Sequence, residues 1–246
     1  MMRSAHFYIT YLLCVSLGIL SVIFVLYWSF RWRGGFAWDG STHQFNWHPV
    51  FMVTGLVVLY GNAVVLYRIP LTWGQNKQSC KLLHGGLLFL AMLLAILGLC
   101  AVFDFHNSNH IPNLYSLHSW LGISTVTLFT AQWMLGLSAF VLPCSPMAFR
   151  RLLKPVHICM GSMVFVLSIT SCLTGINEKL IFISEGKTNA TQRYSALPPE
   201  SVFGNTLGVL IVAFGLVVLN ILSTQKWQRP EPRCDETTRL LSPEDI

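Results

Sequence analysis

Long apolar stretches alternate with short polar connections along the chain. Six of these stretches approach the roughly 20 residues that a helix needs to cross a bilayer, and they cover residues 7–30, 47–67, 82–103, 115–142, 155–177 and 202–223. The first stretch is too long for a signal sequence and lacks a small-residue cleavage site. No strand-like alternation separates the stretches. The pattern therefore predicts an all-α integral membrane protein with six transmembrane helices.

Composition and charge agree with a membrane protein. Of the 246 residues, 53% are hydrophobic and 11% are charged, and the mean hydropathy is +0.56. A soluble domain usually carries about 25% charged residues. The net charge of +6 is spread over the loops without a helical period, which favours membrane lipids or a small anion as partners and argues against nucleic acid.

The distribution of basic residues predicts the orientation. Eleven of the sixteen Lys and Arg residues lie in segments on the same side as the N-terminus, if the six stretches alternate in direction. Because inner loops are enriched in basic residues, both termini are expected in the cytoplasm. Asn189 begins a glycosylation sequon on the expected outer side, which agrees. None of the seven cysteines lies in an outer loop, so no disulfide framework is implied.

Four of the eight histidines lie inside or at the start of four consecutive apolar stretches: His48, His84, His118 and His157. Successive helices of a bundle run in opposite directions. His48 and His118 are therefore expected near the outer side, and His84 and His157 near the inner side. A lone membrane histidine is most often an interfacial residue or a hydrogen-bond partner. One in each of four consecutive helices, paired by depth, points instead to ligation, because ionisable groups at depth are costly and tend to mark function.

Zinc and haem are the two candidates for such pairs. A structural zinc site generally needs four ligands, and no cysteine or carboxylate completes the outer pair. At the inner level Cys80 lies four residues before His84, but Cys159 points away from His157. Two facing imidazoles suit the axial positions of a haem iron, which then favours electron transfer. Small residues beside the histidines, Gly85, Gly86, Gly122 and Gly161, would let a flat ring approach the helix backbone.

Four motifs resemble the cytochrome b561 family. They are N-W-H-P at 46–49, K-L-L-H at 81–84, H-N-x-x-x-x-P-N-L-Y-S-L-H-S-W at 106–120 and L-K-P-x-H at 153–157. They follow one another over residues 46–178, and the R-G-G-F-A-W stretch at 33–38 is most similar to the lysosomal animal member. The resemblance implies a central four-helix bundle holding two b-type haems. It also implies electron transfer from cytoplasmic ascorbate to ferric iron or monodehydroascorbate across the membrane.

The resemblance also implies roles for individual residues. His48 and His118 would ligate the outer haem iron, and His84 and His157 the inner one. Further haem contacts would come from Arg68, Asn113, Leu114, Tyr115, Ser116 and Glu178. The cytoplasmic ascorbate site would comprise Lys77, Lys81 and Arg150, and the outer substrate site Phe105 and His106 with Tyr115 nearby. Independently, basic inner loops would concentrate an anionic donor, although the positive-inside rule requires basic inner loops in any case.

A histidine-lined metal or proton transporter without redox turnover is the alternative function. It would need midplane carboxylates or broken helices, and no Asp or Glu lies within the six predicted helices. Residues 1–223 are thus expected to form the six-helix domain. Residues 224–246 are expected to be a disordered cytoplasmic tail. In that tail Glu236, Leu240 and Leu241 resemble a dileucine sorting signal, which would direct the chain to late endosomes or lysosomes. A homodimer through the first or sixth helix is a further expectation from the resemblance.

Overall fold

The computed structural model describes residues 2–142, 145–184 and 193–230, and the side chains from Ala5 onward within them. It contains six helical spans long and apolar enough to cross a membrane, as the hydropathy pattern predicts. No strand occurs within the described residues. The predicted fold class is confirmed.

Each span is either one helix or a short series of helical segments. The elements are α1 (Met2–Arg31), α2 (Thr42–Phe45), α3 (Trp47–Met52), η1 (Val53–Leu59), α4 (Tyr60–Val65), η2 (Leu66–Arg68), η3 (Pro70–Thr72), α5 (Lys77–Ser108), α6 (Leu117–Gly136), η4 (Leu137–Val141), α7 (Met147–Ser184), η6 (Tyr194–Ala196), α8 (Pro199–Ser223) and η7 (Gln225–Trp227). The second span runs through α2, α3, η1, α4 and η2, and the fourth through α6 and η4.

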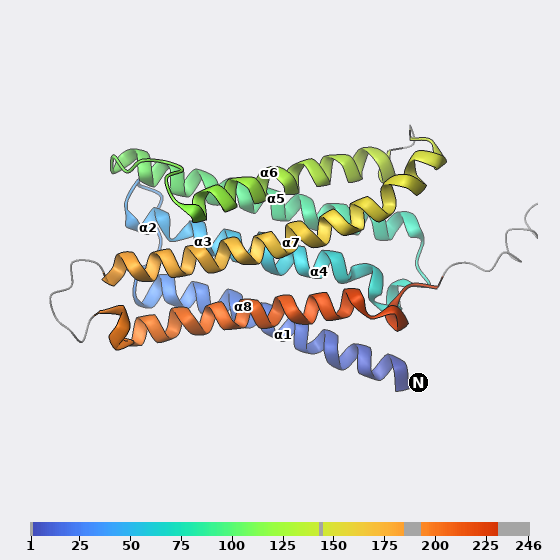
Figure 1. Cartoon of the computed structure of the whole chain (residues 1–246), viewed down its shortest axis with the longest axis horizontal. Coiled ribbons are helices and arrows are strands. Elements are labelled where there is room, and N and C mark those ends of the chain that lie inside the picture. The colour runs from blue at the N-terminus through green and yellow to red at the C-terminus, as the bar shows by residue number, and fades with distance from the viewer. Residues whose placement is uncertain (1, 143–144, 185–192, 231–246) are drawn as a thin grey trace, which may run out of the picture.

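The six spans run lengthwise and alternate in direction (Figure 1). The N-terminus, the connections at 69–76 and 145–146, and residues 224–230 lie at one end of the bundle, which we call the inner end after the predicted orientation. The connections at 32–41, 109–116 and 193–198 lie at the other, outer end. The two ends of the described chain therefore share one end of the molecule.

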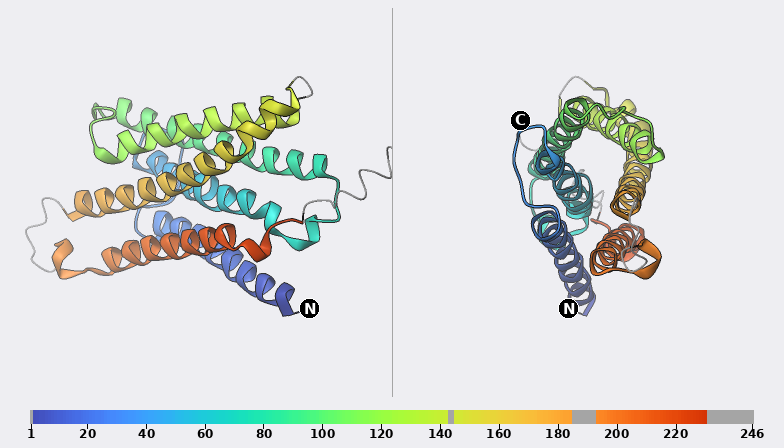
Figure 2. Two further views of the ribbon diagram at one scale, coloured as in Figure 1. Left: turned by 45° about the vertical axis from the view of Figure 1, so that its right-hand side comes forward. Right: turned by 90° about the vertical axis from the view of Figure 1, so that its left-hand side faces the viewer.

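The second span is the most enclosed of the six. It contacts α1, α5, α7 and α8, while α1 packs mainly on α8 and α6 mainly on α7. The end-on view in Figure 2 places α1 and α8 together on the side of the bundle away from α5 and α6. Midway along, the buried Tyr60 contacts the rings of Phe129 and Phe165 and donates its hydroxyl to the backbone oxygen of Gly161. This core ties the second span to α6 and α7.

The helix ends follow local side-chain chemistry. Ser116 forms a capping box with Ser119 at the start of α6, and Asn76 accepts a hydrogen bond from the backbone N–H of Gln78 at the start of α5. Both α5 and α7 extend past the predicted limits at each end, because polar residues continue their helices beyond the apolar stretch. The helix α7 even continues through Pro155, as membrane helices can.

Two π-helical segments, Val53–Leu59 and Leu137–Val141, interrupt the second and fourth spans. Hydropathy does not predict them. At Gly55 a β-carbon would lie 2.9 Å from the backbone oxygen of Ala91, so the second span approaches α5 more closely than a larger residue would allow. Such segments are frequent near functional sites, and the second one follows Gly136 and lies beside His157.

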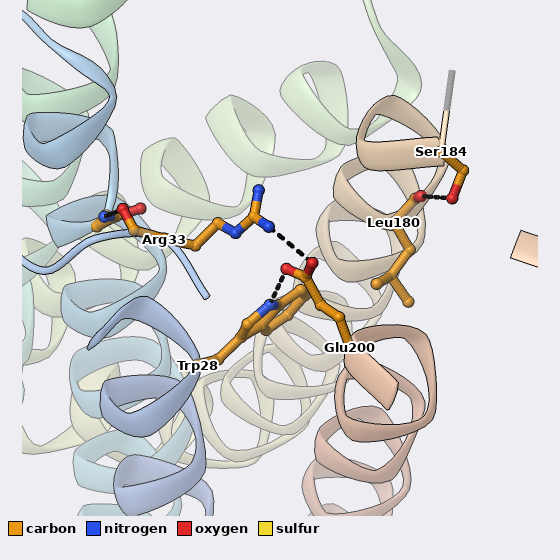
Figure 3. A network of polar contacts seen from close by, with 6 residues as sticks. Trp28, Arg33, Leu180, Ser184 and Glu200 are labelled. Atoms are coloured by element: carbon orange, nitrogen blue, oxygen red, sulfur yellow. Dashed lines mark hydrogen bonds and ion pairs between the residues drawn. The ribbon is translucent and has the colours of Figure 1, made fainter. Parts of the chain in front are cut away.

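Both ends of α8 are fastened by side chains. At the outer end Glu200 accepts hydrogen bonds from Trp28 Nε1 (2.8 Å) and Arg33 Nη2 (2.6 Å), the latter an ion pair, as Figure 3 shows. At the inner end Arg68 donates to the backbone oxygens of Leu222 and Thr224. A guanidinium at a helix C-terminus satisfies free carbonyls and opposes the helix dipole.

Residues 224–230, expected within the disordered tail, are ordered in the structure. They include the 3-10 turn Gln225–Trp227. The ring of Trp227 packs edge-on against Phe7, and Arg229 Nη2 donates to the backbone oxygens of Trp73 and Gln75. One aromatic ring and one guanidinium therefore anchor this polar segment to the bundle. The remainder of the tail, from 231 to 246, lies outside the described residues.

Candidate functional site

The outer histidines face each other across one cavity. His48 lies on α3, and His118 is the second residue of α6; their ring centroids are 6.0 Å apart and the ring planes meet at 82°. Both line a cavity of about 480 Å³ whose other walls are mostly apolar. This volume falls within the roughly 300–1,000 Å³ of ligand sites. The spacing suits one metal ion bound by a nitrogen of each ring at the about 2 Å typical of metal–imidazole bonds.

Backbone carbonyls fix the proton position on three of the four histidines. The Nδ1 atoms of His48, His84 and His118 lie 3.0, 2.8 and 2.9 Å from the backbone oxygens of Gly98, Ala63 and Ser171, respectively. A carbonyl oxygen can only accept a hydrogen bond, so each Nδ1 carries the proton and donates it. The lone pair then resides on Nε2, the arrangement found in metal-bound histidines.

The inner histidines belong to α5 and α7. The ring centroid of His84 lies 5.4 Å from that of Tyr67, and the ring centroid of His157 lies 5.2 Å from that of Phe140. The Nδ1 of His157 is buried without a hydrogen-bond partner in the described part of the chain. Its ring packs on Gly136, where a β-carbon would lie 2.8 Å from the His157 Cε1 atom. The inner pair therefore has one oriented ring and one held by packing.

The surroundings of both pairs fit a flat macrocycle. A β-carbon added at Gly85 or Gly86, next to His84, would meet no atom within 4 Å, so space lies beside the backbone there. At the outer level, the cavity supplies that space. The fit rests on four imidazoles, three of them with an oriented Nε2, together with apolar walls. No group of three His, Cys, Asp or Glu side chains that could hold a metal ion occurs within the described residues, and Cys80 points instead toward Thr72 and Arg229.

The residues expected at the outer haem edge surround the cavity. Asn113, Leu114, Tyr115, Ser116 and Glu178 all line it. Ser116 donates its hydroxyl to Glu178 Oε2 (3.0 Å), which joins the start of α6 to α7. Leu114 has a φ of 56°, a backbone conformation that is strained for a branched side chain, and its backbone oxygen accepts a hydrogen bond from Trp120 Nε1.

The residues expected to bind the outer substrate line the same cavity. Phe105 and His106, near the end of α5, have ring centroids 5.7 Å apart. Phe105 also contacts Phe45, whose ring lies 6.0 Å from that of His48. A chain of rings thus connects His106 to the outer histidine pair.

The inner cations gather at the end of the fourth span. Lys81 Nζ donates to the backbone oxygen of Phe140 (3.0 Å), and Arg150 Nη2 donates to that of Leu142 (3.0 Å). Arg150 also has a buried Nε without a partner among the described residues. Lys77 is exposed one turn before Lys81. Arg68, expected at a haem propionate, is the residue that holds the end of α8.

Among the residues that line the cavity, Arg33, Phe45 and Lys179 were not predicted from the sequence. Helical spacing could have indicated Lys179, because Ser171, Gly175 and Lys179 are four residues apart and share one face of α7. Nothing in the sequence alone places Arg33, which arrives from the connection after α1. Asn189, Glu236, Leu240 and Leu241 lie outside the described residues.

Comparison with known proteins places the chain in a family. The model of eukaryotic cytochrome b561 matches residues 47–183. The lysosomal membrane ascorbate-dependent ferrireductase CYB561A3 of Danio rerio is 65% identical over 230 residues, covering 94% of this chain and 93% of that protein. The human protein of that name is 52% identical over 231 residues, with 94% of each covered.

A relative from another membrane is more distant. The plasma membrane ascorbate-dependent reductase CYBRD1 of Xenopus laevis is 44% identical over 227 residues, covering 92% of this chain and 77% of that protein. The family model spans more than half of the chain, and these relatives cover nearly all of it. The chain therefore belongs to the eukaryotic cytochrome b561 family, and this membership implies haem b as its cofactor.

Proposed function

We propose that this protein transfers electrons across a lysosomal membrane, from ascorbate at the inner end to ferric iron or monodehydroascorbate at the outer end. One observation supports this most directly. His48 and His118 face each other near the outer end of the bundle, His84 and His157 lie toward its inner end, and three of the four rings have an oriented Nε2. The names of the relatives, which describe ascorbate-dependent reductases, favour redox turnover over the transporter alternative.

In this proposal the bundle holds two haems b. His48 and His118 ligate the outer haem, and His84 and His157 the inner one. When bound, haem supplies reversible one-electron oxidation and reduction. Asn113, Leu114, Tyr115, Ser116 and Glu178 form the outer haem edge. Arg68 serves the inner haem edge while it holds the C-terminus of α8.

Lys77, Lys81 and Arg150 form the donor site of the proposal. Ascorbate is an anion at neutral pH, and a cluster of positive charges at the mouth of a site raises the local concentration of an anionic substrate. Lys81 and Arg150 each donate to a backbone oxygen at the end of the fourth span. These bonds hold both side chains over the inner end, where an anion can replace the carbonyls as the acceptor.

The acceptor site of the proposal lies around Phe105 and His106. An imidazole can bind ferric iron, or donate the proton that monodehydroascorbate takes up when an electron reduces it to ascorbate. The half-buried rings of Phe45 and Phe105 place apolar groups between His106 and the outer histidine pair.

Orientation and location complete the proposal. Both termini face the cytoplasm, Asn189 carries a glycan on the luminal side, and Glu236, Leu240 and Leu241 direct sorting to late endosomes and lysosomes. Two relatives are named as lysosomal membrane proteins. Exposed apolar side chains of the spans contact membrane lipid, and a homodimer through α1 or α8 stays a prediction.

Vesicles test the proposed function. Purified protein would be reconstituted with haem, and vesicles with ascorbate trapped inside would be given an external ferric chelate and a ferrous indicator. We expect external ferrous iron to form only in protein-containing vesicles loaded with ascorbate. The matched variant His84→Ala should abolish this flux, because it removes an inner ligand. Flux without ascorbate, or full flux in the variant, would refute the proposal.

A further inference from the structure

The outer cavity contains two cations that the proposed function leaves unused. Among the described residues that line it, Arg33 and Lys179 are the only Lys or Arg residues. Arg33 comes from the connection after α1 and Lys179 from α7. The family model covers Lys179 but not Arg33. One of the two cations therefore belongs to the region that the family model matches, and the other to a segment outside that region.

Lys179 lies against an aromatic ring, and among the described residues no acidic side chain lies within ion-pair distance of it. Its Nζ lies 4.1 Å from the centroid of the Phe45 ring, a cation–π contact. It makes no hydrogen bond or ion pair to another residue that the structure describes. Phe45 also contacts His48 and Phe105, so the ammonium group lies against a ring that touches both the outer histidine pair and the outer substrate residues.

The two acidic groups nearest to Lys179 have other hydrogen-bond partners. Glu200 is engaged by Arg33 at 2.6 Å and by Trp28, and Glu178 accepts a hydrogen bond from Ser116. Arg33 presents a second vacant donor, since its buried Nε has no partner among the described residues. A half-buried cation in apolar surroundings is costly unless an anion accompanies it.

We propose that Lys179 and Arg33 together bind a carboxylate in the outer cavity. Ammonium and guanidinium groups form charge-assisted hydrogen bonds to carboxylates. Two sources could supply the carboxylate: a propionate of the outer haem, or an organic acid that chelates the ferric acceptor. The inference rests on the proposed function, because it takes this cavity as the outer haem and acceptor site.

The experiment compares the wild type with Lys179→Gln, Lys179→Arg and the control Arg31→Gln. Arg31 is an outer cation at the end of α1 that lies near the Trp32 ring and does not line the cavity. Midpoint potentials of the haems would be measured by redox titration of purified protein, reconstituted with haem b or with its dimethyl ester. The KM would be measured for ferric citrate and for a neutral ferric chelate.

If the carboxylate is a propionate of the outer haem, the midpoint potential of that haem should change. Lys179→Gln should lower the midpoint potential of one haem only, because loss of a cation destabilises the reduced form. The difference should disappear with the dimethyl ester, and Lys179→Arg should restore the potential. If the carboxylate belongs instead to an organic acid that chelates the ferric acceptor, the KM for ferric citrate should be at least about tenfold higher in Lys179→Gln. The KM for the neutral chelate and both midpoint potentials should then be unchanged.

Two results would overturn the inference. One is a Lys179→Gln variant that matches the wild type and Arg31→Gln in every potential and KM. The other is a potential shift that persists with the dimethyl ester and is accompanied by no KM change, because that shows only the distant effect of a charge. The redox titration needs no turnover, so failure of the proposed function would show separately, as haem that ascorbate does not reduce.

Discussion

The outer and inner histidine pairs are built on the same plan but are fixed to different degrees. His118 packs on Gly175 and donates to the carbonyl of Ser171, four residues before that glycine. His157 packs on Gly136 in the same way, yet its Nδ1 has no partner within the described residues. The helices α6 and α7 thus repeat one arrangement in opposite directions, and only the outer copy includes the carbonyl bond.

This difference indicates how each end is suited to its task. The outer rings are both oriented by carbonyls and open on one cavity. At the inner end Gln132 donates to the backbone oxygen of His157 (2.6 Å), so the helix position is fixed by a hydrogen bond while the ring is held by packing alone. Orientation of a ligand by its neighbours raises metal affinity, and we therefore expect the outer site to bind haem more tightly.

The largest effect is expected when one histidine of a pair is removed at a time. His118→Ala and His157→Ala should each reduce haem content to about half of the wild type, because each pair loses its ability to ligate iron from both sides. Haem per protein and the reduced-minus-oxidised spectrum of purified protein would show it. His110→Asn is the control, because Asn tolerates the positive φ of this loop residue. Loss of all haem in both variants would contradict two independent sites.

A subtler pair of changes leaves the ligands in place. In Gly175→Ala a β-carbon would lie 2.7 Å from His118 Cε1, and in Gly136→Ala 2.8 Å from His157 Cε1. Each ring must move, and we expect haem affinity at that level to fall by about 10–100-fold, as for changes in residues that orient metal ligands. Because alanine is the better helix former by about 1 kcal/mol, lost helicity would not explain the result. Haem-transfer kinetics to apomyoglobin would measure the loss.

If the outer pair is the more rigid, Gly175→Ala should have the larger effect. The ring of His118 cannot turn without breaking its bond to Ser171, whereas the ring of His157 makes no such bond. Equal losses in the two variants would show that packing, and not the carbonyl bond, sets the orientation of these rings.

Much of the fold and part of the site could be predicted from sequence. Hydropathy gave the six spans, since a bilayer demands long apolar helices, and the alternating direction placed His48 with His118. Local patterns did not reveal the π-helical segments, which depend on contacts such as Gly55 with Ala91. Nor could they show that Arg33 reaches the cavity, because an irregular connection carries it there.

The outer and inner ends also differ in the contacts that hold the two ends of α8. At the outer end Glu200→Gln would remove the charge that pairs with Arg33 while an amide oxygen could still accept from Trp28. We expect a loss of about 1.5–3 kcal/mol in the free energy of unfolding, the range for a hydrogen bond between charged groups. Thermal unfolding in detergent would measure it, with Glu178→Gln as the comparison. An unchanged midpoint temperature would show that the ion pair is dispensable.

The smallest expected effect concerns the inner end and the donor site. Arg229 Nη2 donates to the backbone oxygens of Trp73 and Gln75, which directly precede the start of α5 and its Lys77 and Lys81. In Arg229→Gln this connection should loosen, and the KM for ascorbate should rise by about two- to tenfold, the range for one net hydrogen bond. The kcat and the KM for the ferric acceptor should stay constant, because the outer end is unaffected.

The control for that last variant is Lys226→Gln, which removes an exposed cation from the same segment. If both variants raise the KM for ascorbate equally, the tail acts only through its net charge near the donor site. If only Arg229→Gln does, the tail positions the connection at 73–75, and the inner end depends on a segment beyond the six spans. The outer histidines, by contrast, are held by carbonyls within the spans themselves.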